Sequence, residues 1–203
     1  TFILDDGFQH RKVKRDLDIV CIDSTDPFGG GKMLPAGRLR EYRSGLQRAD
    51  VVIVTRANLG SGLAVLRSGI ADLNPNAAIL TSETAISGVV ELKEIQTKKK
   101  PSRREIKEHN VFAFCGIGNP DIFFKQLWQD GFEAAGTRAF RDHHVYSQED
   151  IGEIEKLARD SQADLLLTTA KDAVKLQDLE FSLPCYVVEI EMLIDKPDVL
   201  AAL

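Results

Sequence analysis

Short apolar runs alternate with amphipathic stretches along most of this chain, and no other feature of the sequence limits the possible folds so strongly. Short apolar runs bounded by turn residues are typical of buried strands, whereas apolar residues three and four apart are typical of helices. Strands are expected at 1–4, 18–22, 50–54, 78–81, 111–117, 137–140, 163–169 and 185–190, and helices at 63–73, 120–131 and 147–160. This order predicts an α/β fold with a largely parallel sheet, and 203 residues with 43% hydrophobic content suffice for one sizeable core or two small ones.

A polar segment interrupts this pattern near the middle of the chain. Residues 87–110 include the charged run KKKPSRRE and the alternating piece VVELKEI, which is typical of a hairpin or a connector. We therefore expect residues 1–86 to form one α/β domain, residues 87–110 a β-hairpin-like linker, and residues 111–203 a second, smaller α/β domain. In the second domain, Ser147 followed by Asp150 predicts a capping box at the start of a helix.

Composition excludes several classes of protein. The formal net charge of −5 argues against broad, nonspecific nucleic-acid binding, which requires a basic face. Cys21, Cys115 and Cys185 each lie inside an apolar run without CxxC spacing, so neither a disulfide framework nor a zinc site is expected, and a reducing cytosol fits best. No apolar stretch approaches the ~20 residues of a membrane-spanning helix, and no signal peptide is visible.

The opening stretch TFILDDGFQH directs two acids beyond the end of a predicted strand. Open α/β sheets bind ligands at the carboxyl ends of their strands, and an aspartate there often helps to hold Mg²⁺. Asp5 and Asp6 are therefore candidate metal ligands, and Gln9 and His10 follow closely enough to contact a nucleotide or an acceptor. The alternative is that both acids cap a turn through Gly7 and that His10 is a capping side chain.

The glycine-rich stretch DPFGGGKMLPAGRLRE is a second candidate. It resembles a phosphate loop at first sight, but the G-x-x-x-x-G-K-[ST] spacing fails because Met33 stands where a hydroxyl residue is required. Arg38 and Arg40 flank a turn and can bind phosphate through paired N–H groups, and Glu41 follows them directly. The alternative is a solvated surface loop.

The stretch RDHHVY predicts an acid–base group. A histidine with an ordinary pKa of ~6.5 can accept a proton near neutral pH, and the adjacent carboxylate of Asp142 would orient His143. The alternative is that a histidine only hydrogen-bonds the start of the next helix, a role that suits His144 better.

Polar residues also follow two further predicted strands. Thr55 and Asn58 lie where P-loop proteins place residues that recognise the base of the nucleotide. Lys171 and Asp172 leave a strand of the second domain, where the lysine would either meet a phosphate or form a surface pair with Asp172.

Six motifs, in this order, make the sequence specific: DDGFQHRKVKRDLDIV, LPAGRLRE, DVVIVTRAN, FAFCGIGNP, RDHHVY and TTAKDAVKL. Together they resemble the tetraacyldisaccharide 4'-kinase family over nearly the whole chain. The resemblance implies a P-loop kinase that transfers the γ-phosphoryl group of ATP to the 4'-hydroxyl of a tetraacylated disaccharide 1-phosphate, giving lipid IVA. It also implies two α/β domains joined by a two-stranded linker, with the first a P-loop-kinase-like parallel sheet.

The resemblance covers the C-terminal two-thirds of the family pattern, without the Walker A loop or an upstream catalytic aspartate, so this chain alone is expected to be inactive. It implies the cofactors ATP and Mg²⁺ and the metal ligands Asp5, Asp6 and Glu41. The implied catalytic residues are His143, Asp142 and Asp6, and the implied nucleotide- or acceptor-binding residues are Gln9, His10, Arg38, Arg40, Thr55 and Asn58. Two positions depart from the family pattern: Tyr42 replaces a proline, and Ala170 replaces a glutamate.

The implied partners are the lipid disaccharide and, peripherally, the cytoplasmic face of the bacterial inner membrane, with no nucleic acid. Lys98–Lys100, with Arg103 and Arg104, would either touch anionic lipid or form a solvated linker. Two other functions stay open. One is a non-catalytic nucleotide- or lipid-binding module derived from the kinase, and the other is a dinucleotide-dependent oxidoreductase that uses the glycine turn GIGNP. That turn lacks the third glycine of the dinucleotide fingerprint, so we expect it to start a helix instead.

Overall fold

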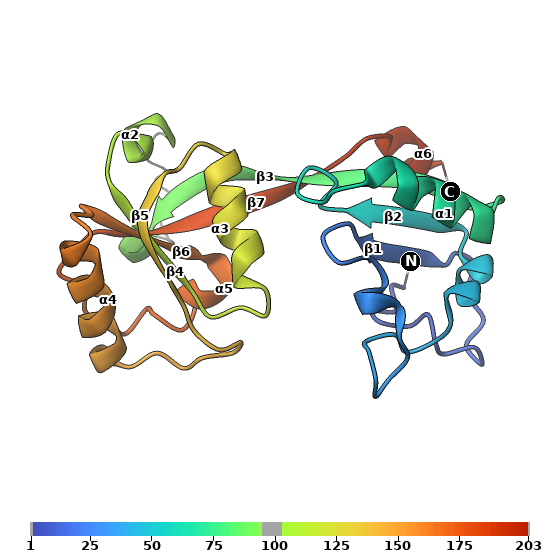
Figure 1. Ribbon diagram of the computed structural model, residues 1–203, viewed down its shortest axis with the longest axis horizontal. Helices are drawn as coiled ribbons and strands as arrows, with labels where there is room; N and C mark the ends of the chain where they lie inside the picture. The colour runs from blue at the N-terminus through green and yellow to red at the C-terminus, as the bar shows by residue number, and fades with distance from the viewer. Residues whose placement is uncertain (1, 95–102, 203) are drawn as a thin grey trace. The chain divides into compact units, whose positions relative to one another are not determined.

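The computed structural model describes residues 2–94 and 103–202, and within them seven strands form a sheet in the order β1-β2-β3-β7-β6-β4-β5 (Figure 1). The strands are β1 (Ile19–Asp23), β2 (Val51–Thr55), β3 (Ala78–Glu91), β4 (Val111–Cys115), β5 (Ala134–Ala139), β6 (Leu165–Thr169) and β7 (Cys185–Ile194). The α-helices are α1 (Leu63–Leu73), α2 (Arg103–Lys107), α3 (Pro120–Gln129), α4 (Gln148–Asp160), α5 (Ala170–Ala173) and α6 (Pro197–Ala201). Short 3₁₀ helices are η1 (Pro27–Gly31), η2 (Arg43–Arg48) and η3 (Leu92–Glu94).

The predicted α/β fold with a largely parallel sheet is confirmed. The pairs β1–β2, β2–β3, β4–β5, β4–β6 and β6–β7 are all parallel. The chain divides into two compact units, unit 1 (Thr1–Thr84 with Met192–Leu203) and unit 2 (Ala85–Glu191), and β3 and β7 each contain residues of both. The predicted boundaries of the two domains and the linker, at residues 86 and 110, stay a prediction.

In unit 1, β2 is buried on both faces, which explains its uninterrupted apolar sequence. Val52 and Val54 pack with Ile70 of α1 on one face, whereas Val51 and Ile53 pack on the other face with residues that include Leu80, Ile194 and Leu200. Successive side chains of a strand point to opposite faces, so a run of four apolar residues supplies both clusters. Polar side chains are excluded from the middle of this strand and follow its end.

Unit 2 repeats this arrangement around β4, whose five residues are all buried. Phe112 and Phe114 pack with Ile151 and Ile154 of α4, while the alternate residues of β4 pack with Phe123 and Leu127 of α3 on the other face. Figure 1 shows α3 and α4 beside the strands of this unit. The loops that leave β4, β5 and β6 therefore emerge at one edge of the sheet, beside a strand, β4, that is covered on both faces.

One predicted strand is wrong. Phe2, Ile3 and Leu4 have no regular secondary structure and are exposed. A strand needs a neighbour to satisfy its backbone hydrogen bonds, and none of the described strands pairs with these residues. Asp5 and Asp6 consequently do not sit at the end of a strand in this structure, contrary to the prediction.

Other boundaries differ in detail. The strand predicted at 78–81 continues to Glu91, because β3 passes from one unit into the other. VVELKEI contributes the end of β3 and then η3. Residues 95–102, which hold Lys98–Lys100, lie outside the described residues, as do the side chains of Arg103 and Arg104, so the hairpin-like linker stays a prediction.

No helix in the described ranges combines the length and apolar character of a membrane span.

The predicted capping box at α4 is confirmed. The hydroxyl of Ser147 accepts a hydrogen bond from the backbone N–H of Asp150 at 3.2 Å, and the Asp150 carboxylate accepts one from the backbone N–H of Ser147 at 2.8 Å. Two backbone N–H groups at the helix start, those of Ser147 and Asp150, thereby have acceptors.

We predict that Ser147→Ala lowers the free energy of unfolding of unit 2 by about 0.5–2 kcal/mol, because one donor at the start of α4 loses its acceptor. Urea denaturation, with amide hydrogen exchange across α4, measures the effect. Ser68→Ala, which removes an exposed hydroxyl from α1, is the control and should not destabilise, since alanine is the better helix former. Equal stability of Ser147→Ala and the parent protein would contradict the prediction.

Candidate functional site

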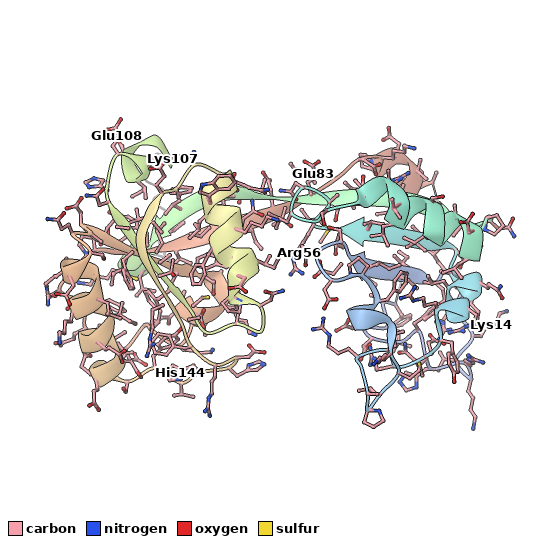
Figure 2. All side chains as sticks on the ribbon, viewed as in Figure 1. Lys14, Arg56, Glu83, Lys107, Glu108 and His144 are labelled. Carbon is pink, nitrogen blue, oxygen red and sulfur yellow. The ribbon has the colours of Figure 1, made fainter. Side chains whose placement is uncertain are left out.

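In unit 1, polar residues gather where β1 and β2 end. Asp23, the last residue of β1, accepts hydrogen bonds from the Thr25 hydroxyl at 2.7 Å and backbone at 3.0 Å, and forms an ion pair with Arg56. Burial alone would raise the pKa of Asp23, but the Thr25 hydrogen bonds and the Arg56 charge outweigh it and lower the pKa. Arg56, labelled in Figure 2, has a φ of +54°, and its carbonyl accepts a 2.6 Å hydrogen bond from the buried Ser24 hydroxyl.

Asp23 and Arg56 are not among the site residues predicted from the sequence. The available signal was an acid and a base directly after two predicted parallel strands, whose carboxyl ends meet at one edge of the sheet.

Glu41 connects the two N-terminal motifs. Its carboxylate accepts hydrogen bonds from Arg48 at 2.9 and 3.0 Å, from Arg11 at 3.4 Å and from the Gln9 amide at 3.5 Å. The Arg48 guanidinium also lies over the Phe8 ring, 4.4 Å from its centroid. The segment that contains Gln9 is therefore held against the RLRE motif, as the predicted pairing of these motifs in one site requires.

Asp6 forms an ion pair with Arg40. Both of its carboxylate oxygens accept hydrogen bonds from Arg40, one of them at 2.7 Å, and its backbone has a φ of +55°. The hydrogen bond from Arg40 is the main reason why the pKa of Asp6 lies below its ordinary value, with a smaller contribution from the charge of His10. The side chains of Asp5 and His10 are exposed.

A cavity of about 240 Å³ lies within unit 1 and is lined by residues from both motifs. The predicted site residues among its lining are Gln9, Arg38, Arg40 and Glu41, to which the structure adds Asp23 and Arg43. Arg38 forms an ion pair with Asp26. The cavity is thus rich in arginine, although its arginines are partly engaged with carboxylates.

The triple glycine of η1 supports these arginines by close approach. Gly29 has a φ of +52°, and a Cβ there would lie 2.8 Å from the Cβ of Arg38. Gly31 has a φ of +77°, and a Cβ there would lie 2.5 Å from a guanidinium nitrogen of Arg43. A side chain at either position would displace an arginine, so this loop positions cavity residues and is not a Walker A loop.

The side chains of Thr55 and Asn58 form hydrogen bonds with backbone groups. The Thr55 hydroxyl is 3.5 Å from the Ile22 carbonyl. The Asn58 amide donates to the Thr84 carbonyl at 2.8 Å and accepts from the Thr84 N–H at 3.1 Å, which ties the loop after β2 to β3. Neither residue is among those lining the cavity.

The predicted metal ligands do not fit Mg²⁺ as the structure stands. Within the described residues, no group of three or more histidine, cysteine or acidic side chains is arranged to hold a metal ion. Asp6 and Glu41 each direct both carboxylate oxygens at an arginine, and a cation would have to compete with that guanidinium. Asp5 is exposed.

In unit 2, three motifs meet at the carboxyl edge of the sheet. The carboxylate of Asp172, which is completely buried, accepts hydrogen bonds from the Gly116 N–H at 2.9 Å and the Thr169 hydroxyl at 2.8 Å. A Cβ on Gly116 would lie 3.0 Å from the Tyr146 hydroxyl and 3.3 Å from the Arg141 carbonyl. The turn after β4, the loop after β5 and α5 therefore form one packed cluster.

His143 projects from this cluster. Its imidazole is 76% exposed and its φ is +61°, while its backbone N–H donates to Asp142 Oδ1 at 3.0 Å. The ring Nε2 lies 3.8 Å from Asp142 Oδ2. Asp142 also accepts a 3.0 Å hydrogen bond from Lys171, which is the main reason why the pKa of Asp142 is lowered. The structure thus brings together His143 and Asp142, as predicted, and adds Lys171.

His144 plays the structural part that we expected of one histidine. Its ring stacks on Phe140 with centroids 4.6 Å apart, and its Nε2 lies 3.2 Å from the Asp150 carboxylate at the start of α4. Figure 2 labels this residue in unit 2. The assignment of His144 to the helix start is confirmed.

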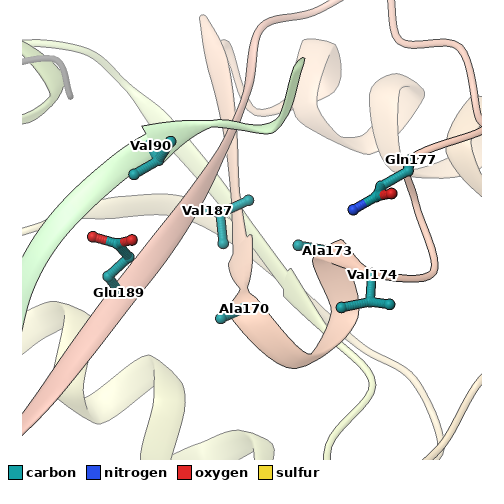
Figure 3. Close-up of a pocket in the computed structure, with 7 residues that line it drawn as sticks. All are labelled: Val90, Ala170, Ala173, Val174, Gln177, Val187 and Glu189. Carbon is teal, nitrogen blue, oxygen red and sulfur yellow. The ribbon is translucent and has the colours of Figure 1, made fainter. Parts of the chain in front are cut away.

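A smaller cavity of about 110 Å³ lies on another part of unit 2, shown in Figure 3. Ala170, the position that departs from the family pattern, contributes to its mainly apolar lining together with Ala173, Val174 and Val187. Gln177 and Glu189 are the polar residues at its edge (Figure 3).

Each of the three cysteines has a raised pKa. Burial, chiefly, raises the pKa of Cys115 to about 12, and burial likewise raises the pKa of Cys185. Burial also raises the pKa of Cys21. A thiol with a raised pKa is protonated near neutral pH and reacts poorly.

These observations define a class of protein: an α/β protein whose arginine-rich and histidine-containing loops leave the carboxyl ends of parallel strands, where such proteins bind phosphorylated ligands. The chain belongs to the tetraacyldisaccharide-1-P 4'-kinase family, whose model matches residues 1–203. The family expected from the six motifs is therefore confirmed.

Named relatives agree with this membership. The tetraacyldisaccharide 4'-kinase of Halothermothrix orenii is 40% identical over 205 residues, covering 94% of this chain and 53% of that protein. The enzymes of the same name from Bdellovibrio bacteriovorus and Syntrophus aciditrophicus are 39% and 37% identical, covering 87% and 95% of this chain and 51% and 53% of their own lengths. The chain thus spans about half the length of the curated relatives it matches. No solved structure matches the chain significantly.

We predict that Arg40→Met raises the pKa of Asp6 toward its ordinary value of 3.8, because the guanidinium that stabilises the carboxylate is removed. In the parent protein the ion pair is intact above the lowered pKa and is lost as the pH falls through it. A ¹³C NMR titration of the Asp6 carboxyl group measures the shift. Lys14→Met, which removes an exposed cation of the same unit, should leave the titration unchanged. An Asp6 titration that is identical with and without Arg40 would show that the pair does not form in solution.

Proposed function

We propose that the protein containing this chain transfers the γ-phosphoryl group of ATP to the 4'-hydroxyl of tetraacyldisaccharide 1-phosphate, giving lipid IVA. The family supplies the kinase class, and one observation of the structure carries the chemistry. This observation is the exposed imidazole of His143, which stands on a backbone held by Asp142 at the carboxyl edge of a buried sheet. The first unit would then be part of a P-loop-kinase-like domain.

In this mechanism His143 accepts the proton of the sugar hydroxyl at a ring nitrogen as the hydroxyl oxygen attacks the γ-phosphorus of ATP. The bond between that phosphorus and the bridging oxygen breaks, and ADP leaves with the electron pair. The imidazolium formed at His143 is stabilised by the negative charge of the nearby Asp142 carboxylate. An exposed ring can reach a large lipid acceptor that no enclosed pocket would admit.

The arginine-rich cavity of unit 1 is proposed to bind phosphate groups of the nucleotide or acceptor. Arg38 and Arg40 line it, and their exposed partners Asp26 and Asp6 can be exchanged for a phosphate at little cost, because surface ion pairs are weak. Gln9 lines the same cavity, and His10 is the next residue in the sequence. The family resemblance implies that Thr55 and Asn58 contact the nucleotide. Their hydrogen bonds to backbone carbonyls favour a structural role around the loop after β2 instead.

Mg²⁺ belongs to the proposal as the usual companion of ATP, whose phosphate charge it neutralises when bound. Asp5, Asp6 and Glu41 are its proposed ligands, but the arginine partners of Asp6 and Glu41 do not fit this role in the present structure. No step of the mechanism above depends on them.

This chain carries no Walker A sequence. We therefore propose the kinase activity for the protein that contains this chain, and propose that the chain alone does not phosphorylate the lipid disaccharide. A non-catalytic nucleotide- or lipid-binding module is the second candidate, favoured by the complete pairing of Asp6 and Glu41 with arginines. Peripheral binding at the cytoplasmic face of the bacterial inner membrane, without nucleic acid, is part of the same proposal.

We predict that His143→Ala, in the full gene product, lowers kcat by about 10²- to 10⁴-fold with little change in the KM for ATP, because proton removal occurs only in the transition state. A phosphoryl-transfer assay with labelled ATP and the lipid disaccharide measures both constants. His109→Ala, which changes another exposed histidine of unit 2, is the control and should retain activity. An unchanged kcat in His143→Ala would end the assignment.

The proposed metal role of Asp6 requires its carboxylate to exchange Arg40 for Mg²⁺ when ATP binds. On that basis we predict that Asp6→Asn raises the Mg²⁺ concentration needed for half-maximal activity or abolishes activity, since the amide cannot replace a charged oxygen ligand. The same assay with a magnesium titration tests this expectation. Asp16→Asn, an exposed acid beyond the DDGFQH motif, provides the comparison. Wild-type metal dependence in Asp6→Asn would show that Asp6 serves only its arginine partner.

A further inference from the structure

Lys171 reaches the loop of the proposed base from a different strand end. Its ammonium donates to Asp142 Oδ1 at 3.0 Å, and the same oxygen accepts the backbone N–H of His143 at 3.0 Å. One carboxylate oxygen therefore receives a charged donor from α5 and an amide donor from the residue that carries the imidazole. The position of the His143 backbone depends on where Asp142 is held.

The His143 backbone needs such support. A φ of +61° lies in the left-handed region, which residues with a side chain seldom adopt unless the surroundings hold them there. On the C-terminal side, the loop is anchored by the stacking of His144 on Phe140 and by the buried ring of Tyr146. On the N-terminal side, Lys171 supplies the ion pair that holds Asp142.

Lys171 itself stands on a rigid base. It lies in the single turn of α5, whose start is capped by Thr169: the Thr169 hydroxyl accepts from the Asp172 N–H at 3.1 Å and donates to the Asp172 carboxylate at 2.8 Å. The buried Asp172 also accepts the Gly116 N–H, which ties α5 to the turn after β4. The next glycine of that turn, Gly118, lies so close to Asp142 that a Cβ there would be 3.1 Å from Oδ2.

We propose that Lys171 is a positioning residue that fixes the Asp142–His143 loop, and that its ammonium acts through Asp142 without touching ATP or the acceptor. The proposal rests on the proposed function of His143. It assigns the lysine of the TTAKDAVKL motif to an ion pair with Asp142 and not to phosphate binding. The predicted surface pair with Asp172 is wrong, because Asp172 is completely buried. The geometry favours this role because the ammonium is already directed at Asp142, and because α5 and the GIGNP turn approach the same carboxylate.

The test uses Lys171→Met, Lys171→Arg and His143→Ala in the full gene product. Lys156→Met is the matched control, because it removes an exposed lysine of the same unit that lies on α4. We expect Lys171→Met to lower kcat by about 10- to 100-fold with an unchanged KM for ATP, as a misplaced catalytic group does. Lys171→Arg should recover most of the loss, and Lys156→Met should behave as the parent protein.

A second readout does not depend on activity. The groups that set the titration of Asp142 are Lys171 and His143, and Lys171 is the larger contributor. A ¹³C NMR titration should therefore show a higher pKa for Asp142 in Lys171→Met than in the parent protein, and no change in Lys156→Met.

The outcomes separate the two ideas. If Lys171→Met keeps the parent kcat while His143→Ala is inactive, Lys171 does not position the loop and the role of His143 stands. If Lys171→Met raises the KM for ATP at an unchanged kcat, the lysine binds phosphate and the proposal is wrong. If His143→Ala is fully active, the proposed function loses its base, and the Asp142 titration then decides about Lys171: an unchanged pKa overturns the proposal and a raised pKa supports it.

Discussion

Burial of the central strands on both faces is the constraint on which the rest of this structure depends. The middle of β2 and all of β4 are covered on both sides, so no polar side chain can be accommodated there without a partner. The chemistry-bearing residues are consequently confined to the segments beyond the strand ends. In unit 2 this places the GIGNP turn, the RDHHVY loop and α5 at one edge, where their backbones can contact each other.

Paired charges are the second shared feature of both units. Asp6 pairs with Arg40, Glu41 with Arg48, Asp23 with Arg56, and Asp142 with Lys171. The exposed pairs among them, Asp6–Arg40 and Asp142–Lys171, add little to stability, because solvent screens them. Their effect is on position and ionisation: the carboxylates of Asp6, Asp23 and Asp142 have lowered pKa values and stay charged at neutral pH. The same weakness lets a phosphate group replace an acid at an arginine.

Backbone conformation points to the same places. Among the described non-glycine residues with positive φ, Asp6 (+55°), Arg56 (+54°) and His143 (+61°) each lie in or directly beside an acid–base pair, whereas Phe28 lies in η1 and Gln162 in the turn after α4. Non-glycine residues adopt this region only where the surroundings hold them, and they concentrate at functional sites. The observation agrees with family membership and with the roles proposed for the DDGFQH and RDHHVY motifs.

The sequence by itself determined the kind of elements and the family. Helix α1 lies at the predicted residues, the capping box of Ser147 and Asp150 is present, and the six motifs identify the kinase family, because periodicity, caps and motifs are local properties. The strand expected at 1–4 failed, since a strand forms only with a neighbour. Only the tertiary structure decided which acid pairs with which base. Asp6 and Arg40 are 34 residues apart in the sequence, and Asp142 and Lys171 are 29 residues apart. Such contacts form when separate loops pack together, so a local sequence pattern cannot predict them.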